Sequence, residues 1–238
     1  MPIQFTTSAQ EAAVNGIKML VYGDSGMGKT VLSASLPNVV MLSAESGALS
    51  LSASNLKKIY GTMPYVSPVP MILIKTVDDL SEAYNWILKS NEGKNFQSVA
   101  LDSISEIAET VLNNAKRQVK DPRQAYGELI EKMETVIRAF RDLPGKHVYM
   151  ASKMEPNKDG LTGVIKYGPS MPGAKLGPNL PYFFDFVFRL GMNKDAQGQN
   201  YRFLQTAPDL QFVAKDRSGK LDPIEYPHLG NVIAKALS

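Results

Sequence analysis

The chain has 238 residues with 26 Lys and Arg against 23 Asp and Glu, which gives a formal net charge of +3, and it contains no cysteine. Its length suits a single α/β domain of roughly 200 to 250 residues. The lack of cysteine excludes disulfides, thiolate metal sites and cysteine nucleophiles, so we expect a cytoplasmic protein.

Strands and helices alternate over the first two thirds of the chain. Short apolar runs predict buried strands, and apolar residues at helical spacing predict amphipathic helices. The expected strands cover residues 17–22, 39–42, 71–75, 98–102 and 147–151. The expected helices cover residues 29–36, 47–60, 76–88, 104–115 and 129–140. Thr76 with Asp79 is typical of a capping box at the start of one of these helices.

The last third of the chain has a different pattern. From Ser152 to Pro181 the periodicity vanishes and Gly and Pro recur, so we expect a long loop. Runs at 184–190, 201–206 and 210–214 predict strands with no helices between them. We therefore expect an α/β fold with a mainly parallel central sheet, flanking helices and antiparallel C-terminal strands. Residues 1–16 would form an N-terminal extension and residues 17–238 one core domain.

The segment between the first strand and the first helix matches the phosphate-binding pattern G-x-x-x-x-G-K-[ST]. Its backbone N–H groups can surround a β-phosphate, while Lys29 reaches the β- and γ-phosphates and Thr30 ligates Mg²⁺. A glycine-rich turn without this function explains the glycines but not Lys29 and Thr30 together. The expected nucleotide-binding residues are Gly23, Asp24, Ser25, Gly26, Met27, Gly28, Lys29 and Thr30.

Two acidic residues follow strands whose carboxyl ends meet at the same edge of the sheet. Asp102 ends the fourth strand, where it would hold Mg²⁺ through water, although it also suits a helix cap. Many P-loop ATPases place Glu directly after this Asp, but Ser103 stands there. We therefore predict that Glu45, after the second strand, is the catalytic base, with Glu106 as its rival. A solvated loop acid is the ordinary alternative for Glu45.

Three segments in this order resemble the phosphate loop, the catalytic-Glu segment and the Mg²⁺ strand of the RecA-type P-loop ATPase core. They are Gly23–Thr30, Ser43–Leu49 and Ala100–Ile104. The resemblance covers roughly residues 17–227, and within the superfamily it is strongest to small phage-encoded RecA-core proteins of single-strand annealing and recombination. It implies a RecA-like P-loop NTPase fold, the cofactors ATP and Mg²⁺, and a homo-oligomeric ring or filament.

The sequence departs from RecA itself at two places. Too few residues precede Ile17 for the helix and strand through which RecA polymerises, and too few follow Gly230 for its C-terminal domain. At the end of the fifth strand, where RecA carries a γ-phosphate-sensing Gln, the chain has Ser152 and Lys153. These two residues are therefore the candidate sensors.

The segment Lys215-Asp-Arg-Ser-Gly219 resembles the K-x-R-x-G element of DnaB-like members of the superfamily. In those proteins the Lys and Arg reach the γ-phosphate held by a neighbouring subunit. The resemblance implies that Lys215 and Arg217 are catalytic residues acting between subunits, where a fixed cation stabilises transition-state charge. An exposed hairpin turn is the alternative.

Basic residues gather in two segments. The segment 152–178 falls where RecA-like recombinases keep a mobile loop that binds single-stranded DNA, and a flexible basic loop with an aromatic residue suits such contact. A solvated charged loop is the alternative. The candidate DNA-binding residues are Lys158, Lys166, Tyr167 and Lys175, and the second segment holds Lys116, Arg117, Lys120 and Arg123.

The sequence thus predicts a Mg²⁺-dependent ATPase that acts on single-stranded DNA in phage-type recombination or annealing, with active sites shared between subunits. The expected partners are single-stranded DNA, further copies of the chain and a single-strand-binding protein. No membrane partner is expected, because no apolar run reaches roughly 18 residues. If the chain is phage-encoded, its place is the host cytoplasm. A helicase-like or helicase-loader ATPase is the alternative, followed by a small-molecule P-loop kinase, which the Arg-free loop at 152–178 disfavours.

Overall fold

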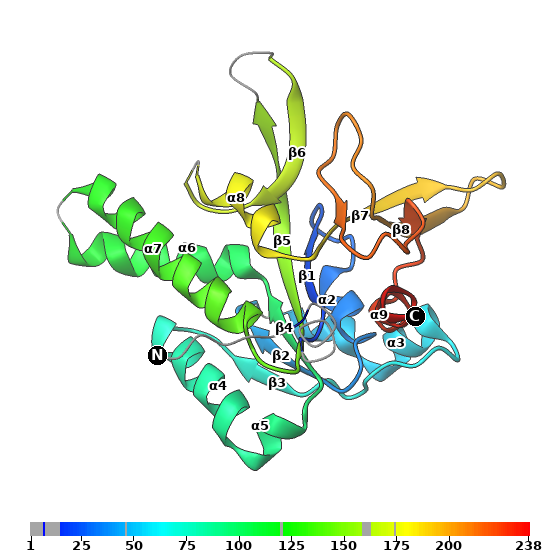
Figure 1. Cartoon of the computed structure of the whole chain (residues 1–238), viewed down its shortest axis with the longest axis horizontal. Helices are drawn as coiled ribbons and strands as arrows, with labels where there is room; N and C mark the ends of the chain where they lie inside the picture. The colour runs from blue at the N-terminus through cyan, green and yellow to red at the C-terminus, as the bar shows by residue number, and fades with distance from the viewer. Residues whose placement is uncertain (1–6, 8–14, 46, 120, 159–162, 174) are drawn as a thin grey trace.

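The computed structural model describes residues 7, 15–45, 47–119, 121–158, 163–173 and 175–238 (Figure 1). Its strands are β1 (Lys18–Tyr22), β2 (Val39–Ser43), β3 (Met71–Leu73), β4 (Ser98–Asp102), β5 (His147–Lys158), β6 (Ile165–Ser170), β7 (Phe186–Lys194), β8 (Asn200–Gln205), β9 (Lys215–Asp216) and β10 (Ile224–Glu225). Its helices are α2 (Lys29–Ser33), η1 (Gly47–Leu51), α3 (Ala53–Tyr60), α4 (Val77–Lys89), α5 (Asn91–Asn95), α6 (Ile104–Gln118), α7 (Pro122–Arg141), α8 (Leu176–Asn179), η2 (Leu180–Phe183) and α9 (Leu229–Leu237).

The described strands form one sheet in the order β10-β8-β7-β1-β5-β4-β2-β3, with β6 paired to β5 and β9 paired to β7. The strands from β3 to β7 in this order run parallel to one another, whereas β8 and β9 are antiparallel to β7, and β10 is antiparallel to β8. The α/β fold with a mainly parallel sheet and antiparallel C-terminal strands is therefore confirmed. The strand that leads into the phosphate loop, β1, lies between β5 and β7.

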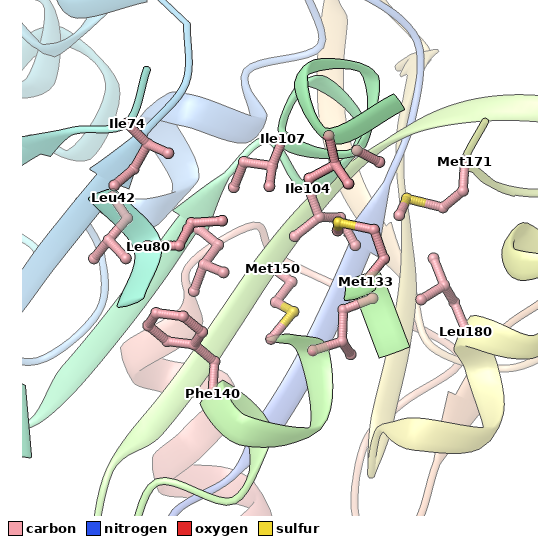
Figure 2. Packing of buried hydrophobic residues seen from close by; sticks show 14 of the residues in the cluster. Leu42, Ile74, Leu80, Ile104, Ile107, Met133, Phe140, Met150, Met171 and Leu180 are labelled. Atoms are coloured by element: carbon pink, nitrogen blue, oxygen red, sulfur yellow. The ribbon is translucent and has the colours of Figure 1, made fainter. Parts of the chain in front are cut away.

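Helices cover both faces of the sheet, which explains why the central strands are apolar throughout. In β1, Leu20 and Tyr22 pack towards α4, α6 and α7, while Met19 and Val21 pack towards α2, α3 and α9. Alternation along a strand sends successive side chains to opposite faces. Figure 2 shows the first of these two cores, in which Ile104 and Ile107 of α6 and Met133 of α7 meet the sheet residue Met150.

The segment 152–181 is not a long loop, so that prediction is wrong. The fifth strand continues to Lys158, and β6 returns along it with Lys153 opposite Ser170 and Lys158 opposite Ile165. The hairpin projects from the body of the sheet (Figure 1), so neither of its faces is fully buried. It consequently lacks the apolar alternation from which strands are predicted. The helices α8 and η2 complete the segment.

Two smaller expectations at the C-terminus also need correction. The segment 210–214 forms only an isolated bridge from Phe212 to Tyr167, and the nearest strand is β9. Helix α9 was not predicted. Of the expected N-terminal extension, residues 1–6 and 8–14 lie outside the described residues, as does Lys120. Within the described part of the chain, no helix is long and apolar enough to cross a membrane.

Candidate nucleotide site

The phosphate loop joins the carboxyl end of β1 to the start of α2. Gly26 and Gly28 have φ angles of 77° and 100°, in the left-handed region that only glycine enters at no steric cost. At Gly23 a Cβ atom would lie 2.6 Å from the carbonyl oxygen of Leu190, so the loop also needs a glycine to pass close to β7. These conformations fold the backbone N–H groups around a space that suits a phosphate.

Lys29 reaches back across this loop. Its Nζ donates hydrogen bonds to the carbonyl oxygens of Gly23 at 2.7 Å and Asp24 at 2.9 Å. Burial lowers the pKa of Lys29, and the nearby carboxylates of Asp102 and Glu45 oppose that shift. The ammonium group is therefore held among the loop residues, where the matched motif would use it to bind phosphate.

Asp102 is the most deeply buried acid of the site, with 2% of its surface exposed. Burial raises the pKa of Asp102 to about 6; the Thr30 hydroxyl lowers it, the Glu45 carboxylate raises it and Lys29 lowers it. Mg²⁺ in nucleotide sites takes one or two protein oxygens, with phosphates and water completing its shell. The Thr30 hydroxyl and the Asp102 carboxylate are such an oxygen pair, so the residues fit Mg²⁺. No cluster of three acidic or His side chains suited to a metal occurs among the described residues.

Glu45 follows β2 and is tied to the residue after Asp102. The Ser103 hydroxyl donates a hydrogen bond to Oε1 of Glu45 at 2.9 Å, and it accepts one from the backbone N–H of Glu106 at 3.3 Å. Ser103 is thus both the N-cap of α6 and the group that orients Glu45. The sequence indicated only that Ser103 replaces an expected Glu.

Glu106 and Lys153 form an ion pair, and Lys153 also contacts Oε1 of Glu109 at 3.1 Å. These carboxylates raise the pKa of Lys153. Glu106 is therefore engaged by a cation, which disfavours it as the base. Of the two candidate sensors, Lys153 lines the site, whereas Ser152 is buried and donates a hydrogen bond to the carbonyl oxygen of Ser170.

The phosphate loop, Glu45, Asp102, Ser103, Glu106 and Lys153 line one cavity of about 910 Å³ at the carboxyl edge of the sheet. The structure brings the phosphate loop together with Glu45, Asp102 and Lys153. Sequence reasoning missed several lining residues, which are Ser50, Asn55, Lys58, Ile59, Tyr60, Arg202 and Pro227. None belongs to a motif, and their place in the site depends on how α3, β8 and the segment before α9 pack.

In a comparison with known protein families, AAA_24, an AAA domain, matches residues 15–218. The chain belongs to this AAA-domain family. Among solved structures, the chain matches the flagellar accessory protein FlaH from Methanocaldococcus jannaschii with a TM-score of 0.42 and 11% identity, covering 81% of this chain and 78% of FlaH. No curated protein matches the chain. The matched residues include every residue so far assigned a nucleotide or metal role.

Lys215 and Arg217 of this AAA domain lie outside the cavity. Strand β9 pairs with the start of β7, whereas the phosphate loop follows the end of β1, so the two sites occupy opposite edges of the sheet. Lys215 Nζ donates hydrogen bonds to the carbonyl oxygens of Phe184 at 2.6 Å and Pro181 at 3.1 Å. Arg217 pairs with Asp185 at 3.0 Å. Neither residue completes the nucleotide site of its own subunit.

The candidate DNA-binding residues occupy the β5–β6 hairpin and the start of α8. Lys158, Lys166 and Lys175 are exposed. Tyr167 is partly buried, because its ring stacks on Phe212 with 5.4 Å between centroids. The Tyr167 carbonyl oxygen also accepts a hydrogen bond from the Tyr22 hydroxyl at 3.2 Å. Tyr167 therefore has a packing role that anchors the hairpin to the sheet.

Proposed function

We propose that this AAA domain is a Mg²⁺-dependent ATPase that acts on single-stranded DNA in recombination or strand annealing of the kind phages encode. In this proposal, copies of the chain form a ring or filament and share active sites. The observation that carries the ATPase part is the convergence of Lys29, Asp102 and Glu45 from three separate segments into one cavity.

Each polar residue of the cavity has its own role in the proposed reaction. Lys29 and the loop N–H groups would bind the β- and γ-phosphates, and Thr30 and Asp102 would hold Mg²⁺, which supplies charge neutralisation on the phosphate oxygens when bound. Glu45 would orient a water molecule and take its proton as the water oxygen bonds to the γ-phosphorus and the bridging P–O bond breaks. Ser103 would keep the Glu45 carboxylate in place.

A neighbouring copy could supply Arg217 to this reaction. The Arg217 side chain is 59% exposed and is held by a single carboxylate, Asp185, so a stronger anion on a facing subunit can compete for it. Mixing Arg217→Ala protein with Glu45→Gln protein should partly restore turnover, because some interfaces then combine an intact Glu45 with an intact Arg217. Mixtures that stay as inactive as either variant alone contradict sharing.

Two basic surfaces support the DNA part of the proposal. The β5–β6 hairpin carries Lys158 and Lys166 on the strand pair that begins at Lys153, inside the nucleotide cavity. The second surface joins the ends of α6 and α7 to the segment before α8. There the Lys116 ammonium lies 5.4 Å from the centre of the Tyr126 ring, and a Cβ atom at Gly173 would lie 3.3 Å from the same ring. The basic segment around Lys116 therefore lies beside the segment that leads to Lys175, although the two are far apart in the sequence.

The test compares ATP turnover and assembly, seen by electron microscopy, with and without single-stranded DNA. We expect DNA to raise turnover and to promote assembly. The double variant Lys158→Ala/Lys166→Ala should weaken DNA binding and reduce the slope of log K against log salt by about 1.4, since each phosphate contact contributes roughly 0.7 on a single strand. Lys220→Ala is the matched control on another exposed turn. Equal turnover and no assembly with DNA would remove the DNA part and leave the ATPase part.

A further inference from the structure

Arg202 of β8 lies over the phosphate loop, although no motif marks it. An ideal Cβ atom on Gly28 would lie 3.6 Å from Nε and 3.8 Å from Cζ of Arg202. Arg202 also lines the nucleotide cavity. In the strand order, β8 lies on the β7 side of β1, whereas β4, which carries Asp102, lies on the β5 side.

The sheet register explains this position. The last residue of β1, Tyr22, pairs with Arg189 of β7, and Met192 of β7 pairs with Arg202. Arg202 therefore lies three residues, or roughly 10 Å, past the end of β1, at the level of the loop. Leu204, two residues after Arg202, is fully buried in the core shared with α2. Because side chains two apart in a strand share a face, Arg202 projects towards α2 and its preceding loop.

Arg202 differs from two other cations of the cavity, Lys29 and Lys153, in having no partner for its charge among the described residues. Lys29 is bonded to two loop carbonyls, and Lys153 is paired with two carboxylates. Arg202 is exposed and makes no ion pair or side-chain hydrogen bond with another described residue. Its charge is therefore available to a ligand. A planar guanidinium suits phosphate oxygens, to which it can donate two parallel hydrogen bonds.

We propose that Arg202 binds the phosphate chain of the nucleotide within its own subunit, closing the site from the β8 side. This deepens the proposed ATPase function and rests on it. Arg202 contacts the phosphates equally in the bound substrate and in the transition state. It therefore raises the affinity for the nucleotide and leaves kcat, the rate at saturation, nearly unchanged.

The test measures the dissociation constant of N-methylanthraniloyl-ADP by fluorescence for wild type and for Arg202→Ala, Arg202→Gln and Arg202→Lys. We expect Arg202→Ala to weaken binding about 10- to 100-fold, as the loss of a charge-assisted hydrogen bond implies. Arg202→Gln should be as weak, and Arg202→Lys should bind with intermediate strength because it keeps the charge but not the planar fork. The kcat of Arg202→Ala should stay within about threefold of wild type while KM rises.

Lys194→Ala is the matched control, because Lys194 is an exposed cation in the same β7–β8 hairpin that does not line the cavity. It should bind like wild type. Arg202→Ala that binds within twofold of wild type overturns the inference, and so does Arg202→Lys that binds as weakly as Arg202→Ala. A wild-type protein that binds no nucleotide instead overturns the proposed function. Equal circular dichroism spectra for all variants ensure that folding is not the cause.

Discussion

The carboxyl ends and the amino ends of the parallel strands form two edges of the sheet, and each edge carries a cavity lined with charged residues. The two cavities differ in how many of these charges have partners within the subunit. At the amino edge, a cavity of about 790 Å³ is lined by Lys18, Arg141, Asp142, Asp185 and Arg217. There Arg141 is bonded to both oxygens of Asp142, Arg217 is paired with Asp185, and Lys18 donates to the carbonyl oxygens of Leu143 and Lys146.

At the carboxyl edge, several charges lack such partners. Asp102 is buried without an ion pair to any described residue, and Arg202 has neither an ion pair nor a side-chain hydrogen bond within the described chain. Thr30 and Lys29 offset the burial of the Asp102 charge only in part, and a buried charge is unfavourable unless something else, such as a ligand, compensates it. The difference indicates that the carboxyl edge is arranged for a charged ligand, while the charges of the amino edge are matched within the subunit.

The largest expected effect is that of Lys29→Ala at the carboxyl edge. This change removes the cation that would stabilise charge on the transferring phosphoryl group, so ATP turnover should fall about 1000-fold. The measurement is steady-state phosphate release, with circular dichroism as the check on folding. Turnover that survives in Lys29→Ala would refute the ATPase assignment and with it the contrast between the edges.

Asp102→Asn should lower turnover on the order of 100-fold and yet stabilise the ligand-free protein. Burial raises the pKa of Asp102 to about 6, against about 3.9 in an unfolded chain. The folded state therefore binds this proton more tightly, so the stability linked to Asp102 is present below about pH 4 and is lost as the pH rises through 6. At pH 7.5 the ionised carboxylate lowers the free energy of unfolding by about 3 kcal/mol.

Urea denaturation of wild type and Asp102→Asn at several pH values measures this effect. The variant should be the more stable protein at pH 7.5, and its advantage should shrink by about half at pH 5, where much of the wild-type carboxyl is protonated. Saturating Mg²⁺ and nucleotide should stabilise wild type more than the variant. An advantage that does not change with pH would mean that Asp102 is not strained by burial.

Ser103→Ala should have a moderate effect on turnover. It removes the hydroxyl that orients Glu45, so we expect kcat to fall about 10-fold with little change in KM. It also removes the N-cap of α6, which lowers the free energy of unfolding by about 1 kcal/mol. A double-mutant cycle with Glu45→Gln separates the two roles. Once Glu45 is replaced, Ser103→Ala should lower kcat no further, and a second 10-fold loss would show that Ser103 acts on another group.

The smallest effect on turnover should come from Lys18→Met at the amino edge. Burial lowers the pKa of Lys18 to about 8, and its ammonium donates hydrogen bonds to the carbonyl oxygens of Leu143 and Lys146 in its own subunit. We expect kcat within about twofold of wild type, measured beside Lys29→Ala, while thermal unfolding reports any change in stability. A 10-fold loss of kcat would mean that Lys18 also contributes to the reaction, in addition to the role proposed for Arg217 at the same edge.

The sequence by itself determined the phosphate loop, because this element is local. Eight consecutive residues define it, and the glycines at 26 and 28 impose the backbone conformation that it needs. The sequence also predicted that Glu45 and Asp102 would lie near the loop, since the carboxyl ends of parallel strands share one edge. The apolar runs predicted the parallel strands because those strands are buried on both faces.

Only the tertiary structure decided which remote residues meet there. The β5–β6 hairpin escaped prediction because no buried face gives it an apolar alternation. Arg202 lies over Gly28 because of the register between β7 and β8, and a shift of one residue would turn its side chain to the opposite face. The pairing of β9 with the start of β7 likewise sets Arg217 at the edge away from its own nucleotide site. Register and pairing depend on contacts between distant segments, which no local pattern encodes.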